Sequence, residues 1–198
     1  MEHFPQNSQK SIQKAMFLDR DGTLNVDYYY VSDPNKIQLI DGAREAVEMF
    51  IRRDFLLFLF TNQPGIEQKI YTKADVETCN QRVIELLGNP HFTEICIASE
   101  ATYAPEHYRK PSPRFINEMV EKYRLERSEC YMIGDKETDA FAGLNAGIRG
   151  VLLESEYAQS PQCEEFIREG KIAAFKNLLD FAQNELPMGL RPIPRKES

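Results

Sequence analysis

Two carboxylates stand two residues apart where a short apolar run ends. The apolar residues 15–18 are followed directly by Asp19-Arg20-Asp21-Gly22-Thr23. On a chain that leaves a strand, carboxylates at i and i+2 can converge on one phosphoryl group, one attacking phosphorus and the other handling protons. Gly22 gives the turn its backbone freedom. The segment is a candidate catalytic site, although Asp-Gly-Thr by itself is also a common turn.

Three further polar segments could act with the first. Thr61-Asn62 follows the apolar run 55–60, and Gly134-Asp135-Lys136-Glu137-Thr138-Asp139 follows the apolar run 130–133. Arg109-Lys110-Pro111 comes before an amphipathic stretch. Taken singly, each could end a strand, cap a helix or lie in solvent. Because parallel strands present their carboxyl ends at one edge of a sheet, we expect the four segments to meet there.

The elements that would position these segments alternate in character. Apolar runs that suit strands buried on both faces cover 15–18, 55–60, 94–98, 130–133 and 150–153. Stretches with apolar residues at helical spacing cover 43–51, 76–87 and 115–123, and a last helix is predicted at about Ile172–Asn184. The pattern predicts an α/β fold with a doubly wound, three-layer α/β/α parallel sheet of Rossmann-like type.

One domain is expected from the length of 198 residues. We assign residues 1–13 to an N-terminal extension, 14–184 to the domain, and 185–198, which contain three prolines, to a C-terminal tail. The intervals after the first and second strands are each filled by a helix and a strand. No large cap domain is therefore expected.

The charge and cysteine content exclude several classes of function. Acidic side chains outnumber basic ones by 31 to 24, giving a net charge of −7, so nucleic acid is an unfavourable partner. No apolar run reaches the roughly 20 residues of a membrane span, and we expect a cytoplasmic protein with no membrane partner. The four cysteines form no Cys-x-x-Cys pair, which favours buried, reduced thiols and argues against zinc.

The four polar segments, in this order, resemble the haloacid dehalogenase superfamily over residues 14–153. That family has an Asp-x-Asp-Gly-Thr loop, a Ser or Thr after the second strand, a Lys, and a Gly-Asp-x-x-x-Asp loop, and all four are present here. The resemblance implies a phosphatase in which Asp19 is the nucleophile and Asp21 is the general acid and then the base. It also implies Mg²⁺ bound by Asp19, Asp21 through its carbonyl, and Asp135.

The same resemblance gives roles to the neighbouring residues. Thr61 and Lys110 would act in catalysis by holding the transferring oxygens. Asp139 would support the ligands of the metal or orient Lys110, and Thr23 would lie outside the residues that contact metal or substrate and support them. Because they flank the catalytic positions, Asn62, Arg109 and Lys136 are predicted to bind substrate.

Within the superfamily the chain is most similar to the capless branch that contains histidinol-phosphate phosphatase and D-glycero-D-manno-heptose 1,7-bisphosphate 7-phosphatase. The matching segments are residues 19–25, 61–66, 109–113 and 134–147. Two departures matter. Residues 99–108 contain no cysteine, so the structural zinc of that branch is not expected here. The Gly-Ile-x-Arg-Gly of that branch is replaced by Gly-Ile-Glu-Gln-Lys at 65–69, which loses the basic residue near the site and weakens the case for a bisphosphate.

Several alternatives stay open at this point. The substrate is predicted to be a small phosphate ester, most plausibly a sugar phosphate, with histidinol phosphate and a nucleic-acid end as the other candidates. A phosphoacceptor signalling domain is the non-enzymatic alternative, but the position of Asp19 after the first strand and the presence of Asp21 disfavour it. Tyr28-Tyr29-Tyr30 could line the pocket or simply pack in a loop. We expect a monomer or a weak homodimer.

Overall fold

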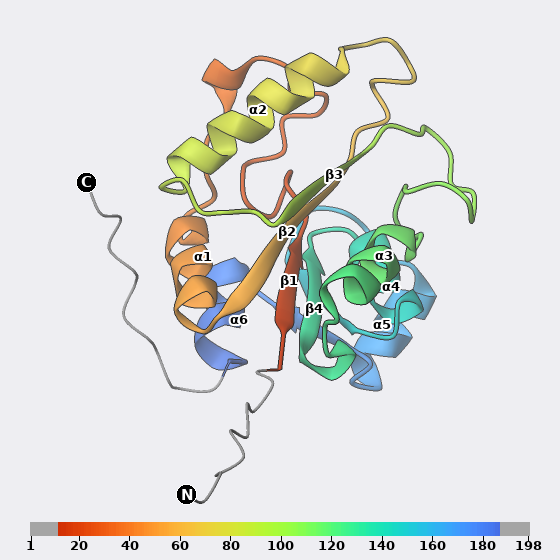
Figure 1. Cartoon of the computed structure of the whole chain (residues 1–198). Coiled ribbons are helices and arrows are strands. Elements are labelled where there is room, and N and C mark those ends of the chain that lie inside the picture. Colours follow the sequence, from red (N-terminus) through yellow and green to blue (C-terminus); the bar gives the residue numbers. More distant parts are fainter. Residues whose placement is uncertain (1–11, 187–198) are drawn as a thin grey trace, which may run out of the picture.

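A single sheet of parallel strands organises the chain (Figure 1). The computed structural model describes residues 12–186, and within them the strands run in the order β3-β2-β1-β4-β5-β6. The strands are β1 (Lys14–Leu18), β2 (Phe55–Asn62), β3 (Glu94–Ala98), β4 (Cys130–Gly134), β5 (Arg149–Leu153) and β6 (Ile172–Phe175). The strand order reverses direction between β1 and β4, the place where an open α/β sheet forms a crevice.

Helices cover both faces of this sheet and confirm the predicted three layers. One face carries α1 (Ala43–Arg52), α2 (Lys73–Leu86) and α6 (Leu178–Asn184). The other carries α3 (Arg114–Tyr123), α4 (Glu137–Asn145) and α5 (Pro161–Arg168). Two short 3-10 helices lie at Pro34–Lys36 and Arg127–Glu129. Residues 12–186 contain no separate cap domain.

The strands are apolar on both faces because each face is covered. In β1, Met16 and Leu18 pack towards α1 and α6, whereas Ala15 and Phe17 pack towards α3. Phe17 stacks on Phe58 of β2 with ring centroids 4.7 Å apart. A strand with two buried faces has apolar residues at successive positions of the sequence, which is why these strands could be predicted.

The predicted last helix is wrong in its first part. Residues Ile172–Phe175 form β6, which pairs in parallel with β5, and the helix begins only at Leu178. Asn177 explains the boundary, because its side chain accepts a hydrogen bond from Asp180 N and caps the first turn. The helices α4 and α5 were not predicted as such. Most of the predicted N-terminal extension and C-terminal tail lies outside the described residues.

The central strands end together, as the sequence predicted. Leu18 is paired with Leu59 of β2 and with Ile133 of β4, so the residues that follow these positions lie at one edge of the sheet. All four cysteines are free and buried, which confirms that prediction. Among residues 12–186, no helix has the length and apolar character needed to cross a bilayer.

Candidate active site

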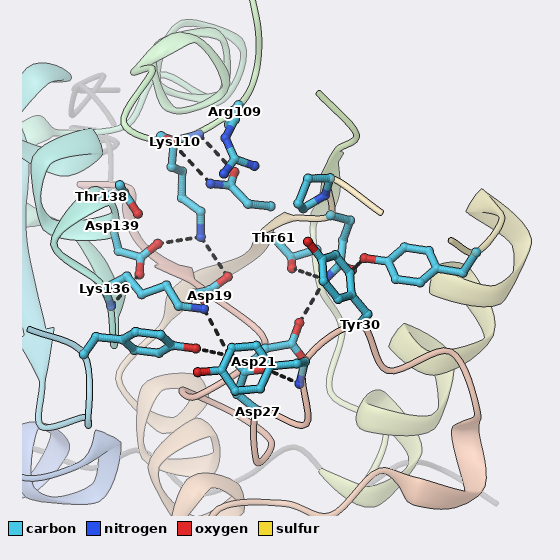
Figure 2. A pocket seen from close by; sticks show the side chains of 16 residues that line it. Asp19, Asp21, Asp27, Tyr30, Thr61, Arg109, Lys110, Lys136, Thr138 and Asp139 are labelled. Carbon is cyan, nitrogen blue, oxygen red and sulfur yellow. Dashed lines mark hydrogen bonds and ion pairs between the residues drawn. The ribbon is translucent and has the colours of Figure 1, made fainter. Parts of the chain in front are cut away.

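A buried ammonium group joins three of the four polar segments (Figure 2). Lys110 Nζ lies 2.7 Å from Asp19 Oδ1 and 2.5 Å from Asp139 Oδ1, and it donates to the carbonyl of Phe60 at 2.8 Å. Burial alone would lower the pKa of Lys110, but the carboxylates of Asp139 and Asp19 outweigh it and the pKa is raised. Lys110 is therefore a fixed positive charge at the end of β1.

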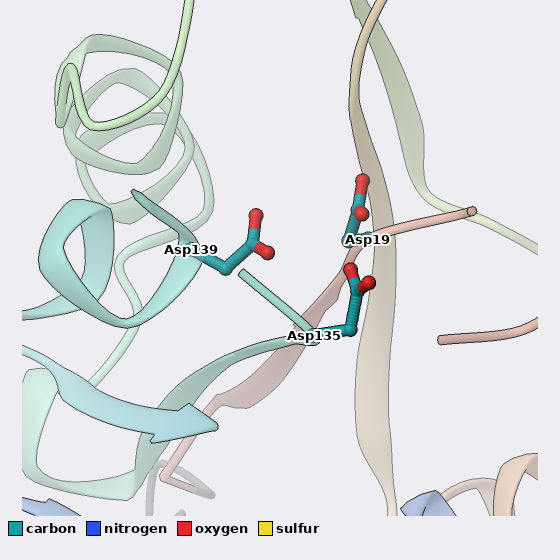
Figure 3. Close-up of side chains that lie close together, drawn as sticks. All are labelled: Asp19, Asp135 and Asp139. Atoms are coloured by element: carbon teal, nitrogen blue, oxygen red, sulfur yellow. The ribbon is translucent and has the colours of Figure 1, made fainter. Parts of the chain in front are cut away.

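Three carboxylates surround this edge and form a candidate metal centre (Figure 3). One carboxylate oxygen from each of Asp19, Asp135 and Asp139 lies within 4.8 Å of the others, and all three side chains are buried. Asp135 Oδ1 is buried without a hydrogen-bond partner. An all-oxygen, negatively charged set with an orphaned oxygen fits a hard divalent cation such as Mg²⁺.

The crowding of these carboxylates disfavours their ionised forms. Burial, opposed by Lys110 and reinforced by Asp139, raises the pKa of Asp19 to about 6. Burial, with the nearby charge of Asp19, raises the pKa of Asp135 to about 8. Both shifts describe the protein without a cation, and a bound cation would reverse them because it favours the ionised carboxylates.

Two glycines allow this close approach. Gly22 has a φ of +79°, and a Cβ placed there would lie 2.2 Å from Asp135 Oδ2. A Cβ at Gly134 would lie 2.1 Å from Asp139 Oδ2. A side chain at either position would displace a carboxylate from the centre, so both glycines are required by space, and Gly22 is required by its backbone conformation as well.

Asp21 is held in a different way from Asp19. Its carboxylate accepts hydrogen bonds from the Arg20 guanidinium at 2.7 Å, from Asn25 Nδ2 at 3.0 Å and from Gln63 Nε2 at 2.9 Å. Arg20 is fully buried and donates its remaining arm to Asn80 of α2 at 2.9 Å. The side chain of Asp21 is therefore engaged by donors and points into the pocket rather than into the cluster of Asp19, Asp135 and Asp139.

The residues predicted to bind substrate have partners within the protein. Asn62 accepts from the Lys110 backbone N–H at 3.0 Å and donates to its carbonyl at 3.3 Å, so it fixes the Lys110 main chain. Arg109 donates to the carbonyl of Glu100 at 3.2 Å. Both still line the pocket. Thr23 lies buried behind the site, and its hydroxyl has no hydrogen-bond partner there.

Lys136 belongs to a contact that the sequence did not predict. Its ammonium lies 3.1 Å from Asp27 Oδ2 and 4.5 Å from the ring centroid of Tyr157. Tyr157 also donates to Asp27 Oδ2 at 2.8 Å. Asp27 and Tyr157 are 130 residues apart in the chain, and no motif marks either of them. This contact joins the loop after β1 to the loop after β5.

A cavity of about 340 Å³ opens above these groups, and its walls are rich in tyrosine. Of the tyrosine run, Tyr29 and Tyr30 line the cavity, together with Tyr71 and Tyr157, whereas Tyr28 does not. Tyr29 and Tyr30 adopt positive φ angles of 48° and 53°, an uncommon conformation for bulky residues. Two of the three tyrosines thus act as pocket wall.

Comparison with known proteins agrees with this geometry. The HAD-hydrolase-like family model matches residues 107–181. A D-glycero-D-manno-heptose-1,7-bisphosphate 7-phosphatase of Chlorobaculum tepidum is 35% identical over 167 residues, covering 77% of this chain and 84% of that protein. A D-glycero-beta-D-manno-heptose-1,7-bisphosphate 7-phosphatase of Helicobacter pylori is 35% identical over 165 residues, covering 77% of this chain and 93% of that protein.

Solved structures show the same architecture. A crystal structure of a HAD-like phosphatase from Mesorhizobium loti superposes with a TM-score of 0.64 at 34% identity, covering 76% of this chain and 77% of that one. The D,D-heptose 1,7-bisphosphate phosphatase of B. bronchiseptica superposes with a TM-score of 0.73 at 20% identity, covering 88% and 98%. The chain is therefore a phosphatase of the haloacid dehalogenase superfamily and belongs to the family of these heptose bisphosphate 7-phosphatases.

Proposed function

We propose that this phosphatase hydrolyses a sugar phosphate of the heptose bisphosphate type through a covalent phosphoaspartate on Asp19. The observation that carries the proposal is the position of the Asp19 carboxylate. It lies at the end of β1, held by Lys110 at 2.7 Å, and it lines the open cavity. A nucleophile needs this combination of a fixed orientation and access to substrate.

The reaction proceeds in two displacements. An Asp19 carboxylate oxygen attacks phosphorus, and the bond from phosphorus to the sugar oxygen breaks while Asp21 gives its proton to that oxygen. Asp21 then accepts a proton from water, whose oxygen attacks phosphorus and releases inorganic phosphate and free Asp19. The Thr61 hydroxyl and the Lys110 ammonium lie beside the site and hold the phosphoryl oxygens during both steps.

The carboxylates favour Mg²⁺ as the cofactor. Asp19 and Asp135 would hold it, with the main-chain carbonyl of Asp21 as a third ligand and Asp139 orienting Lys110 from the side. When bound, the cation supplies electrostatic compensation for the charge of the phosphoryl group next to two carboxylates. The orphaned Asp135 Oδ1 supports this assignment.

The substrate class rests on the relatives and on the charge of the cavity wall. Arg109 and Lys136 bring two cations to the pocket, where they could bind hydroxyls or a second phosphate group. Lys136 is already paired with Asp27, so it presents less free charge than Arg109. A cytoplasmic site of action fits the four unpaired thiols.

Phosphate release from a panel of esters tests the proposal. The panel contains heptose 1,7-bisphosphate, histidinol phosphate, other sugar phosphates and p-nitrophenyl phosphate, each with and without Mg²⁺. We expect the highest kcat/KM with the heptose ester and no turnover by Asp19→Asn. Better turnover of histidinol phosphate would overturn the substrate class, and an active Asp19→Asn would overturn the mechanism.

A further inference from the structure

A short chain of hydrogen bonds lies behind the proposed proton donor (Figure 2). Gln63 Nε2 donates to Asp21 Oδ2 at 2.9 Å and to Thr61 Oγ1 at 2.8 Å. The Tyr71 hydroxyl donates to Gln63 Oε1 at 2.7 Å. Gln63 and Tyr71 are both buried. Gln63 lies within the matching segment 61–66, but the proposed mechanism gives neither residue a role.

The direction of each hydrogen bond follows from the chemistry of the groups. Asp21 Oδ2 already accepts from the Arg20 guanidinium, so the amide nitrogen of Gln63 faces this acceptor and its oxygen faces Tyr71. The Tyr71 hydroxyl then has to donate. Burial raises the pKa of Tyr71 to about 12, which keeps that proton in place at neutral pH. Tyr71 thereby fixes which way the Gln63 amide points.

The backbone holds Gln63 at this position. Its N–H donates to the carbonyl of Ala98 at the end of β3, at 2.6 Å, so the residue is tied to the neighbouring strand. Its side chain then bridges two groups with different proposed tasks, a hydroxyl that binds the phosphoryl group and a carboxyl that delivers a proton. A bridge of this kind sets the distance between the two groups.

We propose that Gln63 and Tyr71 are positioning residues that align Asp21 with the leaving oxygen while Thr61 holds the phosphoryl group. The inference rests on the proposed function. Neither residue touches the reacting atoms. Gln63 acts through Asp21 and Thr61, and Tyr71 acts through Gln63. Asp19 and the carboxylate cluster have other partners, so the loss on an ester that needs proton delivery should exceed any loss that both esters share.

The leaving group provides a test that separates positioning from general support. A sugar alkoxide leaves poorly and needs a proton in the transition state, whereas p-nitrophenolate leaves without one. Because Asp21 also serves as the base in the second displacement, which both esters share, the test follows the first displacement, as release of the leaving group in a single turnover with enzyme in excess. A misaligned Asp21 should slow this step for the sugar ester and hardly affect it for the aryl ester. Damage to the phosphoryl site or to the fold would slow both equally.

The experiment compares Gln63→Met and Tyr71→Phe with Asp21→Asn and the unchanged protein on both esters. Gln63→Met keeps the side-chain volume and removes the donors. We expect the single-turnover rate of leaving-group release from the sugar ester to fall by about 10- to 100-fold in Gln63→Met and about fivefold in Tyr71→Phe, within the range of general acid catalysis. The Mg²⁺ half-saturation and the same rate with p-nitrophenyl phosphate should change less than about threefold.

Tyr131→Phe is the matched control, because Tyr131 is also buried and its hydroxyl also has one partner, Arg149, but it lies outside the pocket. It should change neither rate. If Gln63→Met fails to fold, Tyr71→Phe, which loses a single hydroxyl, still decides the question. An equal loss of the single-turnover rate on both esters, or no loss on either, would overturn the inference.

The outcomes also separate this inference from the proposed function. No phosphate release by the unchanged protein would refute the function itself. A loss in Asp21→Asn that is equal on both esters in the single-turnover rate of leaving-group release would refute proton donation by Asp21, and the inference with it. A leaving-group dependence in Asp21→Asn that is missing from both Gln63→Met and Tyr71→Phe would refute the inference alone.

Discussion

The floor and the mouth of the pocket are built on different principles. The floor consists of Asp19, Lys110 and Asp139, which line the cavity, and of Asp135, which lies next to the two carboxylates. Each is at most 5% exposed, and Lys110 pairs with both Asp19 and Asp139. The mouth is formed by loops, and Tyr29 at its rim is 71% exposed. Strand ends thus fix the groups that make and break bonds, while loops present the surface that a substrate meets first. A change in the floor should abolish the reaction, and a change at the mouth should alter selectivity.

The largest effect is expected from the nucleophile. Asp19→Asn keeps the shape of the floor and removes the attacking oxygen, so kcat should fall by about 10⁴-fold or more. Phosphate release measures the loss, and circular dichroism checks that the variant is folded. A folded variant that retains a tenth of the activity would show that another group attacks phosphorus.

Removing the central cation should cost stability as well as activity. Lys110→Met leaves Asp19 and Asp139 buried without their ammonium partner, a change worth about 3–5 kcal/mol in the free energy of unfolding. Urea denaturation measures this loss. Lys122→Met provides the control, because Lys122 pairs with Glu94 on the surface and its loss should cost less than about 1 kcal/mol. An equal loss in the free energy of unfolding for the two variants would contradict the claim that the ion pairs of the floor contribute more to stability than an ion pair on the surface.

The floor should also respond to pH in a way that depends on the cation. The pKa of Asp135 lies at about 8 in the folded protein and near 4 in the unfolded chain. The folded protein favours the protonated carboxyl of Asp135 more than the unfolded chain does. The stabilisation that follows is fully present below pH 4 and is lost as the pH rises through 8 in the absence of a cation. Mg²⁺ needs the ionised form, so its apparent dissociation constant should fall about tenfold for each unit that the pH rises between pH 6, the pKa of Asp19, and pH 8.

Thermal denaturation with and without Mg²⁺ at pH 6 and pH 8.5 checks this expectation. The increase in Tm caused by Mg²⁺ should be larger at pH 8.5. In Asp135→Asn, which cannot titrate at this position, the increase should be small at both values. An increase that is the same at both pH values in the unchanged protein would exclude Asp135 as the titrating ligand.

The smallest effect is expected at the mouth. Tyr157→Phe removes the hydrogen bond to Asp27 and loosens the contact that holds Lys136. We expect KM for the sugar ester to rise about twofold to fivefold with kcat unchanged, the equivalent of less than about 1 kcal/mol. Tyr103→Phe is the control, because Tyr103 is half exposed and does not line the cavity. A fall in kcat without a change in KM would assign Tyr157 to the floor.

The sequence was informative where local rules decide the structure. Strands buried on both faces are apolar throughout, and the polar residues that end them mark the catalytic edge, so Asp19, Thr61 and Asp135 could be placed. Gln63 was noted only as part of a motif. Its bridge to Asp21 depends on Tyr71, whose approach is set by the loop that follows β2 and by no periodic pattern.

Pairing between distant segments was the part that could not be predicted. The contact between Asp27 and Tyr157 depends on how two loops meet above the sheet. Strand β6 was missed because it is short, and its backbone pairing with β5, rather than any sequence pattern, holds it in the sheet. In both cases tertiary contacts decide the conformation.

The reversal of strand order between β1 and β4 has a consequence for how such an enzyme can change. The chains that leave these two neighbouring strands lead to helices on opposite faces, α1 and α4, so the space between them stays open without any side chain holding it open. Loops bordering that space can be lengthened, shortened or replaced while the strand ends keep their register. The same catalytic residues can thus act on different substrates when the loops at the rim are exchanged. New specificities can arise without new catalytic residues.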